Sequence, residues 1–391
     1  MQSRSPATAI VIGSGISGAA AAYFLAERGV TVQLFEAEAP AAQATGAADG
    51  AVSIASKRPG PMMTAARAGI ELYRHLAGSG LFKDLFKSRS TFIVAASDDE
   101  CNVVENHAKA LAEAGVRVDL LSRTTTLQRF PMLAEKALSS VEVHDEGHAI
   151  GYQIVQRFLS AGGLVVRRRE PVQRLLLAAD GERLAGAETA NGRIFADIVI
   201  VAAGGGTGRL LNLDHVLTPR KGQLLVTERA WHLNAAMPGS IMSGRYLLSK
   251  GSQTSDTGRP LRGIGLIIDP LATGQFLIGG TREDFGDRTV TDMDAVAHIL
   301  ADAVALMPAL ANVRLLRSFA GERTAVIDSL PLVGRLPGLE NAFVIAGFEG
   351  DGICLGPAAA RAVVELACGR TPSMDLSPFE PSRFAELKVA V

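Results

Sequence analysis

The chain opens on two short apolar runs separated by an Ala-rich stretch of helical pattern. Residues 8–13 (TAIVIG) and 31–36 (TVQLFE) have the length and apolar character of buried strands. Between them, Ile16 to Arg28 has the pattern of a helix, which Gly29 stops. A strand, a glycine turn, a helix and a second strand form one unit of a parallel sheet.

Residues 39–202 predict a loop, three helices and several strands. Residues 39–60 are small and Gly/Ala-rich, which favours a functional loop, and helices are predicted over 62–76, 98–114 and 151–161. Strands are predicted over 88–96 and 163–169. Asp180-Gly181 and Asn191-Gly192 favour the primed turns of hairpins, so we expect a three-stranded meander before a buried strand at 198–202.

Residues 216–325 have the pattern of a different domain. Five apolar runs that lack the spacing of strand–helix–strand units indicate a mostly antiparallel sheet, with one helix near 291–306. The predicted strands are 222–228, 244–250, 263–269, 275–281 and 312–320. A strand at 341–347 and a closing helix near 357–368 then return to the first pattern. We expect one domain from 1–78, 144–215 and 326–391, and a second from 79–143 and 216–325.

Composition narrows the class of protein. The 391 residues carry 39 Lys+Arg against 40 Asp+Glu, which argues against a nucleic-acid binder. A 48% apolar content with 20% charged residues is that of a globular protein. The three cysteines are isolated and the histidines do not cluster, so we expect no disulfide framework and no metal site. No run reaches the roughly 18 apolar residues of a membrane span, and we expect a cytoplasmic protein, with peripheral membrane attachment left open.

The turn after the first predicted strand carries a GxGxxG motif, Gly13-Ser14-Gly15-Ile16-Ser17-Gly18. Its first glycine makes the turn, the second admits a pyrophosphate to the backbone, and the third lets helix and strand pack closely. The N-terminus of the helix offers N–H groups to the anion. Glu36 ends the second strand, followed by Ala37, where a carboxylate accepts hydrogen bonds from ribose hydroxyls and repels a 2′-phosphate. The motif predicts dinucleotide binding and argues against NADP.

The order of elements favours FAD over NAD. An NAD domain usually runs through contiguous strand–helix units, whereas here a meander intervenes and the chain returns to the sheet twice. A cofactor that touches such distant segments is long. The loop 347–353 precedes the closing helix, whose N-terminus could face the flavin edge that becomes negative on reduction. A glycine-rich helix entry that only packs is the alternative.

Taken together, these segments resemble the D-amino-acid oxidase-like (DAO) family of FAD-dependent oxidoreductases. Within it, the chain is most similar to glycine oxidases, hydrogen cyanide synthase flavin subunits, and opine or hydroxyproline dehydrogenase β subunits. The resemblance covers nearly the whole chain. It rests on GSGISG with Glu36 and on six further segments, ATGAADG (44–50), ADIVIVAAGG (196–205), RKGQLLVTE (220–228), FLIGGTRED (276–284), GERTAVIDSLPLVG (321–334) and GFEGDGICLGP (347–357). SKRPGP (56–61) resembles the heteromeric β subunits in particular.

The resemblance implies an α/β fold class. One domain is a Rossmann-like parallel sheet with a β-meander, of the glutathione-reductase type, and a mostly antiparallel α+β substrate domain accompanies it. It also implies that Thr45 and Gly46 meet the FAD pyrophosphate, that the Val172 backbone reads the adenine, and that Ala203 with Gly204 closes over the nucleotide. The residues beside the flavin ring would be Gly350, Asp351, Gly352 and Ile353.

The substrate side departs from the family pattern. Family members often have Asn where Asp49 stands and His where Phe348 stands, and the segment 321–334 differs at several positions. An amino-acid carboxylate needs a cation, preferably a guanidinium. The candidates are Arg323, which matches a family Arg and is followed by Asp328, then Arg245 with Tyr246 beside it, and Arg282. Lys57 and Arg58 could face the flavin, although a solvated loop pair is the favoured interpretation.

Three functions stay open. The first is a flavin enzyme that oxidises the C–N bond of a small amino or imino acid by hydride transfer to flavin N5, more consistent with a dehydrogenase than with an oxidase. The second is one component of a hetero-oligomeric dehydrogenase that passes electrons to partner subunits carrying FMN or an iron–sulfur cluster. The third is a flavin-binding subunit that serves assembly and has lost its own chemistry.

Overall fold

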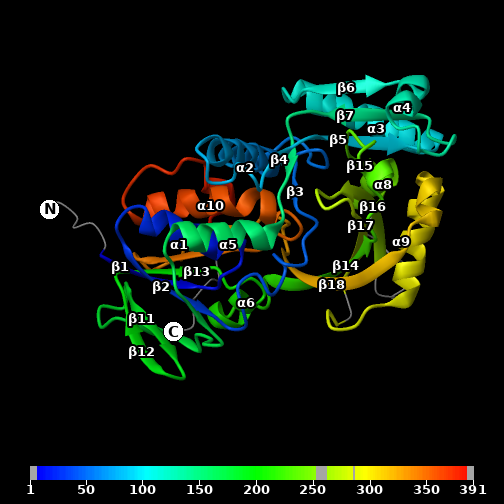
Figure 1. The fold of residues 1–391 in the computed structure, drawn as a ribbon. Coiled ribbons are helices and arrows are strands. Elements are labelled where there is room, and N and C mark those ends of the chain that lie inside the picture. Colours follow the sequence, from blue (N-terminus) through cyan, green and yellow to red (C-terminus); the bar gives the residue numbers. More distant parts are fainter. Residues whose placement is uncertain (1–6, 252–261, 285–286, 385–391) are drawn as a thin grey trace.

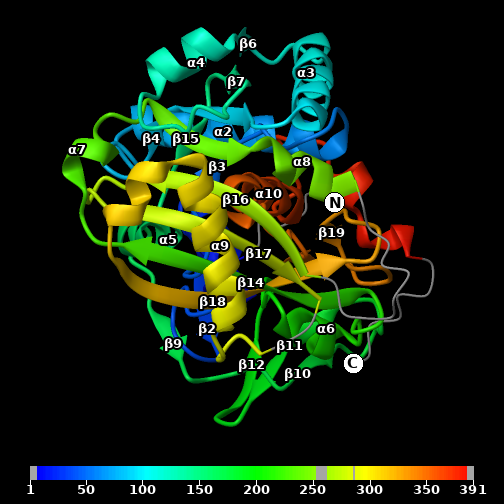
Figure 2. The same ribbon diagram turned by 90° about the vertical axis from the view of Figure 1, so that its right-hand side faces the viewer.

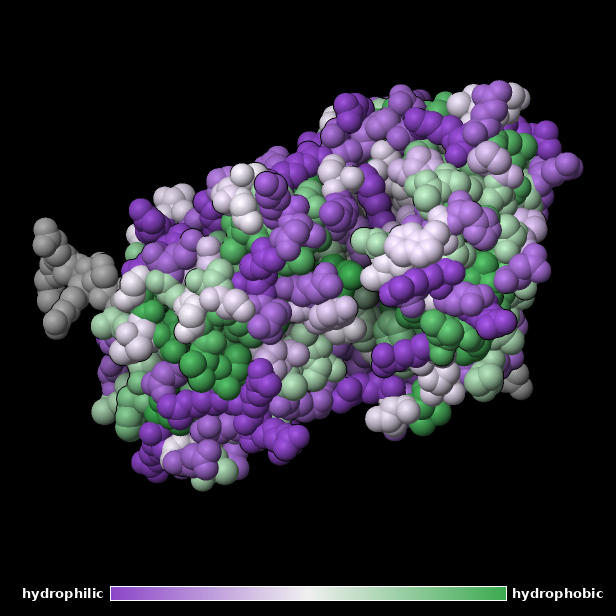
Figure 3. All heavy atoms as spheres, in the orientation of Figure 1, coloured by the Kyte–Doolittle hydropathy of each residue, from purple (hydrophilic) through white to green (hydrophobic). Residues whose placement is uncertain are grey.

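A computed structural model of the chain describes residues 7–251, 262–284 and 287–384. Two large sheets organise the described residues, one mostly parallel and one mostly antiparallel, and they lie side by side in Figure 1. On the face shown in Figure 3, hydrophilic and hydrophobic residues are interspersed.

The first sheet has six strands in the order β19-β20-β13-β1-β2-β9. All neighbours are parallel except β19 and β20. The central strands are buried along nearly their whole length because both faces of the sheet are covered, which explains their continuous apolar runs. The strands are β1 (Thr8–Ile12), β2 (Thr31–Glu36), β9 (Val166–Arg168), β13 (Ile198–Val201), β19 (Leu332–Arg335) and β20 (Ala342–Ala346).

Helices cover one face of this sheet and a meander covers the other (Figure 1). An aromatic cluster joins the helices, with Phe158 of α5 in contact with Tyr23 and Phe24 of α1 at ring-centroid distances of 5.2 and 5.9 Å. The helices are α1 (Ile16–Ala26), α2 (Pro61–Gly78), α5 (Gly151–Ala161) and α10 (Gly352–Ala367). The meander consists of β10 (Arg174–Leu177), β11 (Leu184–Thr189) and β12 (Gly192–Phe195).

The second sheet has eight strands in the order β18-β14-β17-β16-β15-β5-β7-β6, and only β15 and β5 pair in parallel. Helix α9 (Met293–Leu306) crosses its outer face, as Figure 2 shows, and buries Val296 and Ile299 there. The strands are β5 (Ser90–Ala95), β6 (Val118–Leu121), β7 (Ser139–Val143), β14 (Leu217–Thr227), β15 (Gly239–Ser243), β16 (Arg262–Pro270), β17 (Phe276–Glu283) and β18 (Leu315–Val326).

Shorter elements connect the two sheets. A small sheet in the order β3-β8-β4 lies between them. Its strands are β3 (Ala51–Val52), β4 (Lys87–Ser88) and β8 (Gly147–His148), and the other helices are α3 (Asp98–Glu113), α4 (Arg123–Arg129), α6 (Gly206–Leu211), α7 (Trp231–Asn234) and α8 (Gly244–Gly251). Single 3-10 turns occur at Pro308–Asn312, Ser377–Phe379 and Pro381–Arg383.

The expected fold class is confirmed, with a parallel sheet, a meander and a mostly antiparallel sheet. Two details of the prediction are wrong. Residues 244–250 form helix α8 and not a strand, because a short apolar run does not distinguish the two periods. The Tyr246 ring of this helix lies against Gly265 of β16. The closing helix starts at Gly352, with Pro357 inside it. Proline cannot bond the carbonyl four residues earlier, and here the Tyr73 hydroxyl donates to that carbonyl, on Ile353, at 2.9 Å.

The five predicted segments divide between the sheets as follows. Segments 1–78, 144–215 and 326–391 contribute the strands of the parallel sheet, and 79–143 and 216–325 contribute those of the antiparallel sheet, with the end of β18 at the last boundary. Helix α4 and strands β6, β7 and β15 were also not predicted. The first three lie between 115 and 143, where the sequence is polar and irregular in pattern.

Candidate active site

A cavity of about 830 Å³ runs between the parallel sheet and the inner face of the antiparallel sheet. One end is lined by the GxGxxG turn, Glu36 and the 171–173 segment before the meander. The other end is lined by the start of α10 and by strands β14, β16, β17 and β18. The cavity is therefore long, and it joins segments from the beginning, middle and end of the chain.

The three motif glycines have different roles. A Cβ on Gly13, which has φ +99°, would lie 2.3 Å from Ala202 O, and one on Gly18 would lie 1.9 Å from Gly13 O. These two glycines pack the turn, the helix and β13 together. A Cβ on Gly15 would meet only Thr45 Oγ1, at 3.2 Å, and Gly15 lines the cavity. Gly15 is therefore the glycine that keeps space for a ligand.

The groups around this turn suit a pyrophosphate and a ribose. Thr45 Oγ1 accepts a hydrogen bond from Ile16 N, the first residue of α1, at 3.0 Å. Glu36 accepts hydrogen bonds from Ser14 N and Ser14 Oγ, both at 2.8 Å, and still lines the cavity. The carboxylate is thus held at the end of β2, where ribose hydroxyls would meet it. The residues present fit a dinucleotide.

Most of the predicted cofactor residues line the cavity, and three do not. Ser14 is buried behind the turn, Gly18 packs against Gly13, and Gly46 packs against Ala41, whose carbonyl would lie 2.2 Å from a Cβ at that position. These three shape the site from behind. The lining residues among those predicted are Gly13, Gly15, Ile16, Ser17, Glu36, Ala37, Thr45, Val172, Ala203, Gly204, Gly350, Asp351, Gly352 and Ile353.

The N-terminus of α10 forms the wall where the flavin ring would lie. Asp351 is its N-cap residue, and the first-turn N–H groups of a helix have no intrahelical acceptor, so they can stabilise negative charge. Lys57 is only 7% exposed and forms an ion pair with Asp351. Desolvation lowers the pKa of Lys57, but Asp351 outweighs it and leaves that pKa raised. The interpretation of Lys57 and Arg58 as a solvated pair is wrong for Lys57, whereas Arg58 is exposed.

Arg323 and Tyr246 lie over glycines on the inner face of the antiparallel sheet. The guanidinium of Arg323 lies over Gly222 of β14, where a Cβ would be 2.7 Å from Nη2, and the Tyr246 ring covers Gly265. Arg323 Nη1 donates to Thr281 O at 3.3 Å, and within the described chain Arg323 forms no salt bridge. Glycine at these positions gives both side chains room to line the cavity, which Phe348 also lines. Arg323 is thus a cation available to a ligand.

The other predicted arginines are occupied by acidic partners. Arg282 lines the cavity but forms an ion pair with Glu349, which also binds Arg220 at 2.9 Å. The exposed Arg245 pairs with Asp302 of α9 at 3.3 Å and does not line the cavity. The position of Arg245 on helix α8 and not on a strand accounts for this outward direction. Asp328 likewise lies outside the cavity lining, paired with Arg383 at 2.7 Å.

A buried group of charged side chains lies around Asp269 at the cavity wall, and the sequence did not predict it. Asp269 of β16 accepts hydrogen bonds through Oδ1 from Arg89 Nη2 at 2.6 Å and from Ser240 Oγ at 2.5 Å, and it lines the cavity. Asp49 also lines the cavity. Desolvation raises the pKa of both carboxyls, and the negative charge of Asp269 raises the pKa of Asp49 further. No motif marks Arg89 or Asp269, because only the sheet pairing brings them together.

Two further groups support this region from behind. Glu146 is buried and accepts hydrogen bonds from Ile54 N at 2.6 Å and Ala55 N at 2.7 Å, and burial raises its pKa. His148 Nε2 lies 2.8 Å from Asp49 O, and burial with the nearby Arg89 lowers the pKa of His148 to about 4. At neutral pH His148 therefore has a neutral ring.

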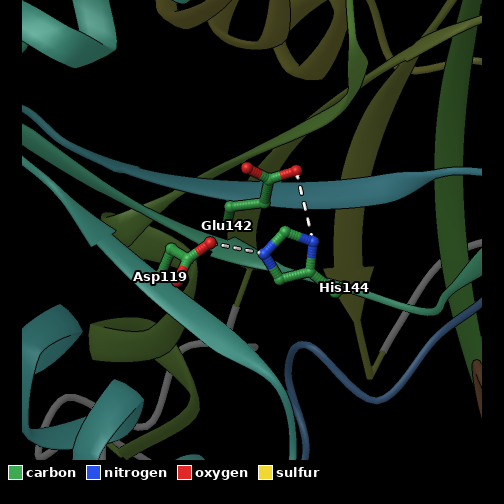
Figure 4. A group of neighbouring side chains, drawn as sticks. All are labelled: Asp119, Glu142 and His144. Atoms are coloured by element: carbon green, nitrogen blue, oxygen red, sulfur yellow. Dashed lines mark hydrogen bonds and ion pairs between the residues drawn. The ribbon is translucent and has the colours of Figure 1, made fainter.

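One cluster elsewhere has the residue types of a metal site. Figure 4 shows His144 between Asp119 and Glu142, with Nε2 2.8 Å from Asp119 Oδ2 and Nδ1 3.5 Å from Glu142 Oε1. Arg129 pairs with the other oxygen of Glu142, and Ser90 Oγ donates to Oε1 at 2.8 Å. Ion pairing and hydrogen bonding account for this arrangement on the second sheet, away from the cavity.

Comparison with known proteins agrees with this geometry. Residues 8–366 match the DAO family, described as FAD dependent oxidoreductase. The chain is 31% identical to a glycine oxidase of Pseudomonas aeruginosa over 208 residues, which are 52% of this chain and 50% of that protein. It is 26% identical to an opine oxidase subunit of Rhizobium meliloti over 403 residues, covering 96% of each. The glycine oxidase structure from Geobacillus kaustophilus superimposes with a TM-score of 0.82 at 22% identity, covering 99% of both chains.

The class of this protein follows from three findings: a parallel sheet with a GxGxxG turn, a long cavity, and a family match over most of the chain. The chain belongs to the DAO family of FAD-dependent oxidoreductases. FAD is its cofactor, and the resemblance predicted from the sequence is confirmed. In the ranges that the structure describes, no helix has the length and apolar character needed to cross a bilayer.

Proposed function

We propose that this protein oxidises the C–N bond of a small amino or imino acid, or of an N-substituted amino acid, and that Arg323 binds the substrate carboxylate. The observation that carries the proposal is the Arg323 guanidinium, which lines the cavity near Gly350 at the start of α10 and forms no salt bridge with the described residues. The names of similar proteins, a glycine oxidase and an opine oxidase subunit, support the same chemistry.

FAD, when bound, would supply the oxidising chemistry, as the acceptor of the hydride equivalent from the carbon next to the substrate nitrogen. The protein orients that carbon and keeps water away from it. Arg323 fixes the carboxylate end through charge-assisted hydrogen bonds, and the planar guanidinium can bind both oxygens at once. Leu224, Leu277 and Ile267 line the same cavity and exclude water from the reacting carbon.

The other side chains of this wall have supporting roles. Tyr246 lies over Gly265 and limits the width of the cavity. Phe348 contributes an apolar surface next to the helix N-terminus. Lys57 neutralises the Asp351 carboxylate at that N-terminus, so this carboxylate does not oppose negative charge on the ring edge.

The test is anaerobic bleaching of the flavin in the purified yellow protein. A panel of D- and L-proline, hydroxyprolines, glycine, sarcosine and opines should contain a substrate that removes the yellow colour. Arg323→Ala should raise the Michaelis constant of that substrate by about 10- to 100-fold, the range for a hydrogen bond to a charged group, and Arg323→Lys should recover part of the loss. An unchanged Michaelis constant in Arg323→Ala would remove Arg323 from the site.

A second candidate function has its own support. The similarity to the opine oxidase subunit of Rhizobium meliloti covers 96% of each chain, and SKRPGP resembles the heteromeric β subunits. In this alternative the chain passes electrons to a partner protein that carries FMN or an iron–sulfur cluster. Reduced enzyme that air reoxidises slowly, but that neighbouring gene products reoxidise quickly, would favour this hetero-oligomeric role over a free-standing oxidase. Flavin that no substrate bleaches even with those partners would favour an assembly role.

A further inference from the structure

We propose that Asp269, with Asp49 beside it, forms a second subsite in the cavity that binds a cationic nitrogen group at the far end of the substrate. The group is an ammonium or a guanidinium, and the substrate is an amino acid with a basic side chain or N-substituent. This inference rests on the proposed function, since Arg323 is taken to hold the carboxylate at the other end.

The first observation is a buried carboxylate oxygen that the fold leaves without a partner. Asp269 is 1% exposed, and its Oδ1 accepts hydrogen bonds from Arg89 and Ser240. Its Oδ2 accepts none from the residues that the structure describes. Such an oxygen costs about 1–3 kcal/mol or more when it is left unsatisfied. Because Asp269 lines the cavity, a ligand donor can reach this oxygen.

The second observation is an excess of acids around this end of the cavity. His148 is neutral at neutral pH because its pKa is lowered to about 4. Burial raises the pKa of Asp269 and of Asp49, although Arg89 acts in the opposite direction on Asp269 and Arg323 on Asp49. A bound cation would supply the missing charge. One base, Arg89, faces three acids here, Asp49, Asp269 and Glu146, and Arg323 acts on Asp49 from the other end of the cavity.

The third observation is the position of the subsite relative to Arg323. Arg323 lies on β18 and Asp269 on β16, and the sheet order β18-β14-β17-β16 places two strands between them. Three steps of about 4.8 Å separate the two strands by roughly 14 Å across the sheet, and the register places Asp269 in the row of Leu277, Val226 and Arg317, roughly 20 Å along the strands from Arg323. The Arg323 side chain covers part of this distance, because its guanidinium lies over Gly222 and donates to Thr281 O. Both side chains project into the cavity and shorten this span. A glycine-sized ligand is too short to contact both the Arg323 and the Asp269 side chains, whereas an amino acid with a long basic side chain can reach both.

The test compares ligands matched in shape that differ in charge. The purified FAD-loaded protein is titrated with arginine and citrulline, and with lysine and norleucine, each as both enantiomers. Binding is measured from the concentration dependence of anaerobic flavin reduction, or from the change in flavin absorbance where no reduction occurs. We expect arginine of one configuration to bind about 10- to 100-fold more tightly than citrulline, the range for a hydrogen bond to a charged group.

Variants separate the subsite from a structural role. Asp269→Asn should bring the arginine-to-citrulline ratio close to one and leave citrulline binding unchanged, whereas a structural loss would weaken both ligands alike. Ser240→Ala is the matched control, because it removes a donor to Oδ1 but leaves the charge and Oδ2 in place, so the ratio should persist. If Asp269→Asn does not fold, Asp49→Asn tests the same ratio without removing the partner of Arg89.

The outcomes distinguish the two proposals. Citrulline that binds and reduces the flavin as well as arginine does would overturn the subsite and leave amino-acid oxidation standing. Arginine that binds selectively would support the subsite even if it reduces no flavin, and the oxidation would then be decided by the amino-acid panel described above. Absence of selective binding by arginine and lysine would overturn the subsite, and the same panel would decide the oxidation separately.

Discussion

Substitution of Gly15 by valine separates the ligand-facing glycine of the GxGxxG turn from those that build the fold. Gly15 has φ −71° and ψ −173°, a conformation that valine adopts without strain. Its Cβ would touch only Thr45 Oγ1, at 3.2 Å, but the two methyl groups would extend into the space that the pyrophosphate needs. We expect the folded protein to persist and FAD binding to be lost.

The magnitudes follow from these contacts. Valine is a poorer N-cap than glycine by about 1 kcal/mol, so the apoprotein should melt no more than roughly 3 °C lower than the wild-type apoprotein. The wild-type holoenzyme gains about 4 kcal/mol at an FAD concentration roughly 1,000 times its Kd. Gly15→Val should gain nothing, because it binds no cofactor.

The assay is the ratio of FAD to protein after gel filtration, combined with melting of both proteins with and without added FAD. Gly18→Ala is the contrasting variant, since its Cβ would lie 1.9 Å from Gly13 O and must displace backbone. That variant should lose stability even as apoprotein. A stable Gly15→Val protein that keeps one FAD per chain would refute the assignment of this end of the cavity to the pyrophosphate.

Three further predictions follow from the buried groups around the cavity. Lys57→Met should destabilise the protein by about 2 kcal/mol, which is less than the roughly 3–5 kcal/mol of a fully buried pair because Asp351 is partly exposed. Asp351→Asn should destabilise the Lys57→Met protein less than it destabilises the wild type, and additive losses in a double-mutant cycle would contradict the pairing. His148 binds a proton below about pH 6.5 in the unfolded chain but only near pH 4 in the native one, so the free energy of unfolding should fall by up to about 3 kcal/mol as the pH drops from 7 to 4. The decline should be shallower in His148→Gln, and identical slopes in denaturant titrations would show that His148 is not responsible. Burial raises the pKa of the Cys354 thiol to about 12, so iodoacetamide at about pH 8 should alkylate it only after unfolding, and mass spectrometry of the native protein showing modified Cys354 would argue against its burial.

Local patterns determined much of the fold and the cofactor end of the site. The run from β1 through α1 to β2 was predictable because a buried parallel strand and a glycine-stopped helix have distinct patterns over few residues. The meander followed from two turn dipeptides with a specific backbone preference. Glu36 and Gly15 could be assigned because their spacing in the chain is fixed by the turn that holds them.

The substrate side depended on the tertiary structure. Arg245 and Arg323 are equivalent as residue types, but only Arg323 lies over a glycine on the inner face of the sheet, while Arg245 projects from α8 toward Asp302. Lys57 has the pattern of a surface residue until the fold brings Asp351, almost three hundred residues later, against its ammonium group.

The sequence by itself determined that this chain forms a parallel sheet with a dinucleotide-binding turn, because the short-range spacing of the glycines specifies that turn. The tertiary structure decided which charges meet in the cavity. Arg89, Asp269 and Asp49 come from three separate segments, and the strength of their interaction depends on distance and on exclusion of water. Neither quantity is present in a linear chain, because both arise only when the two sheets close around the cavity.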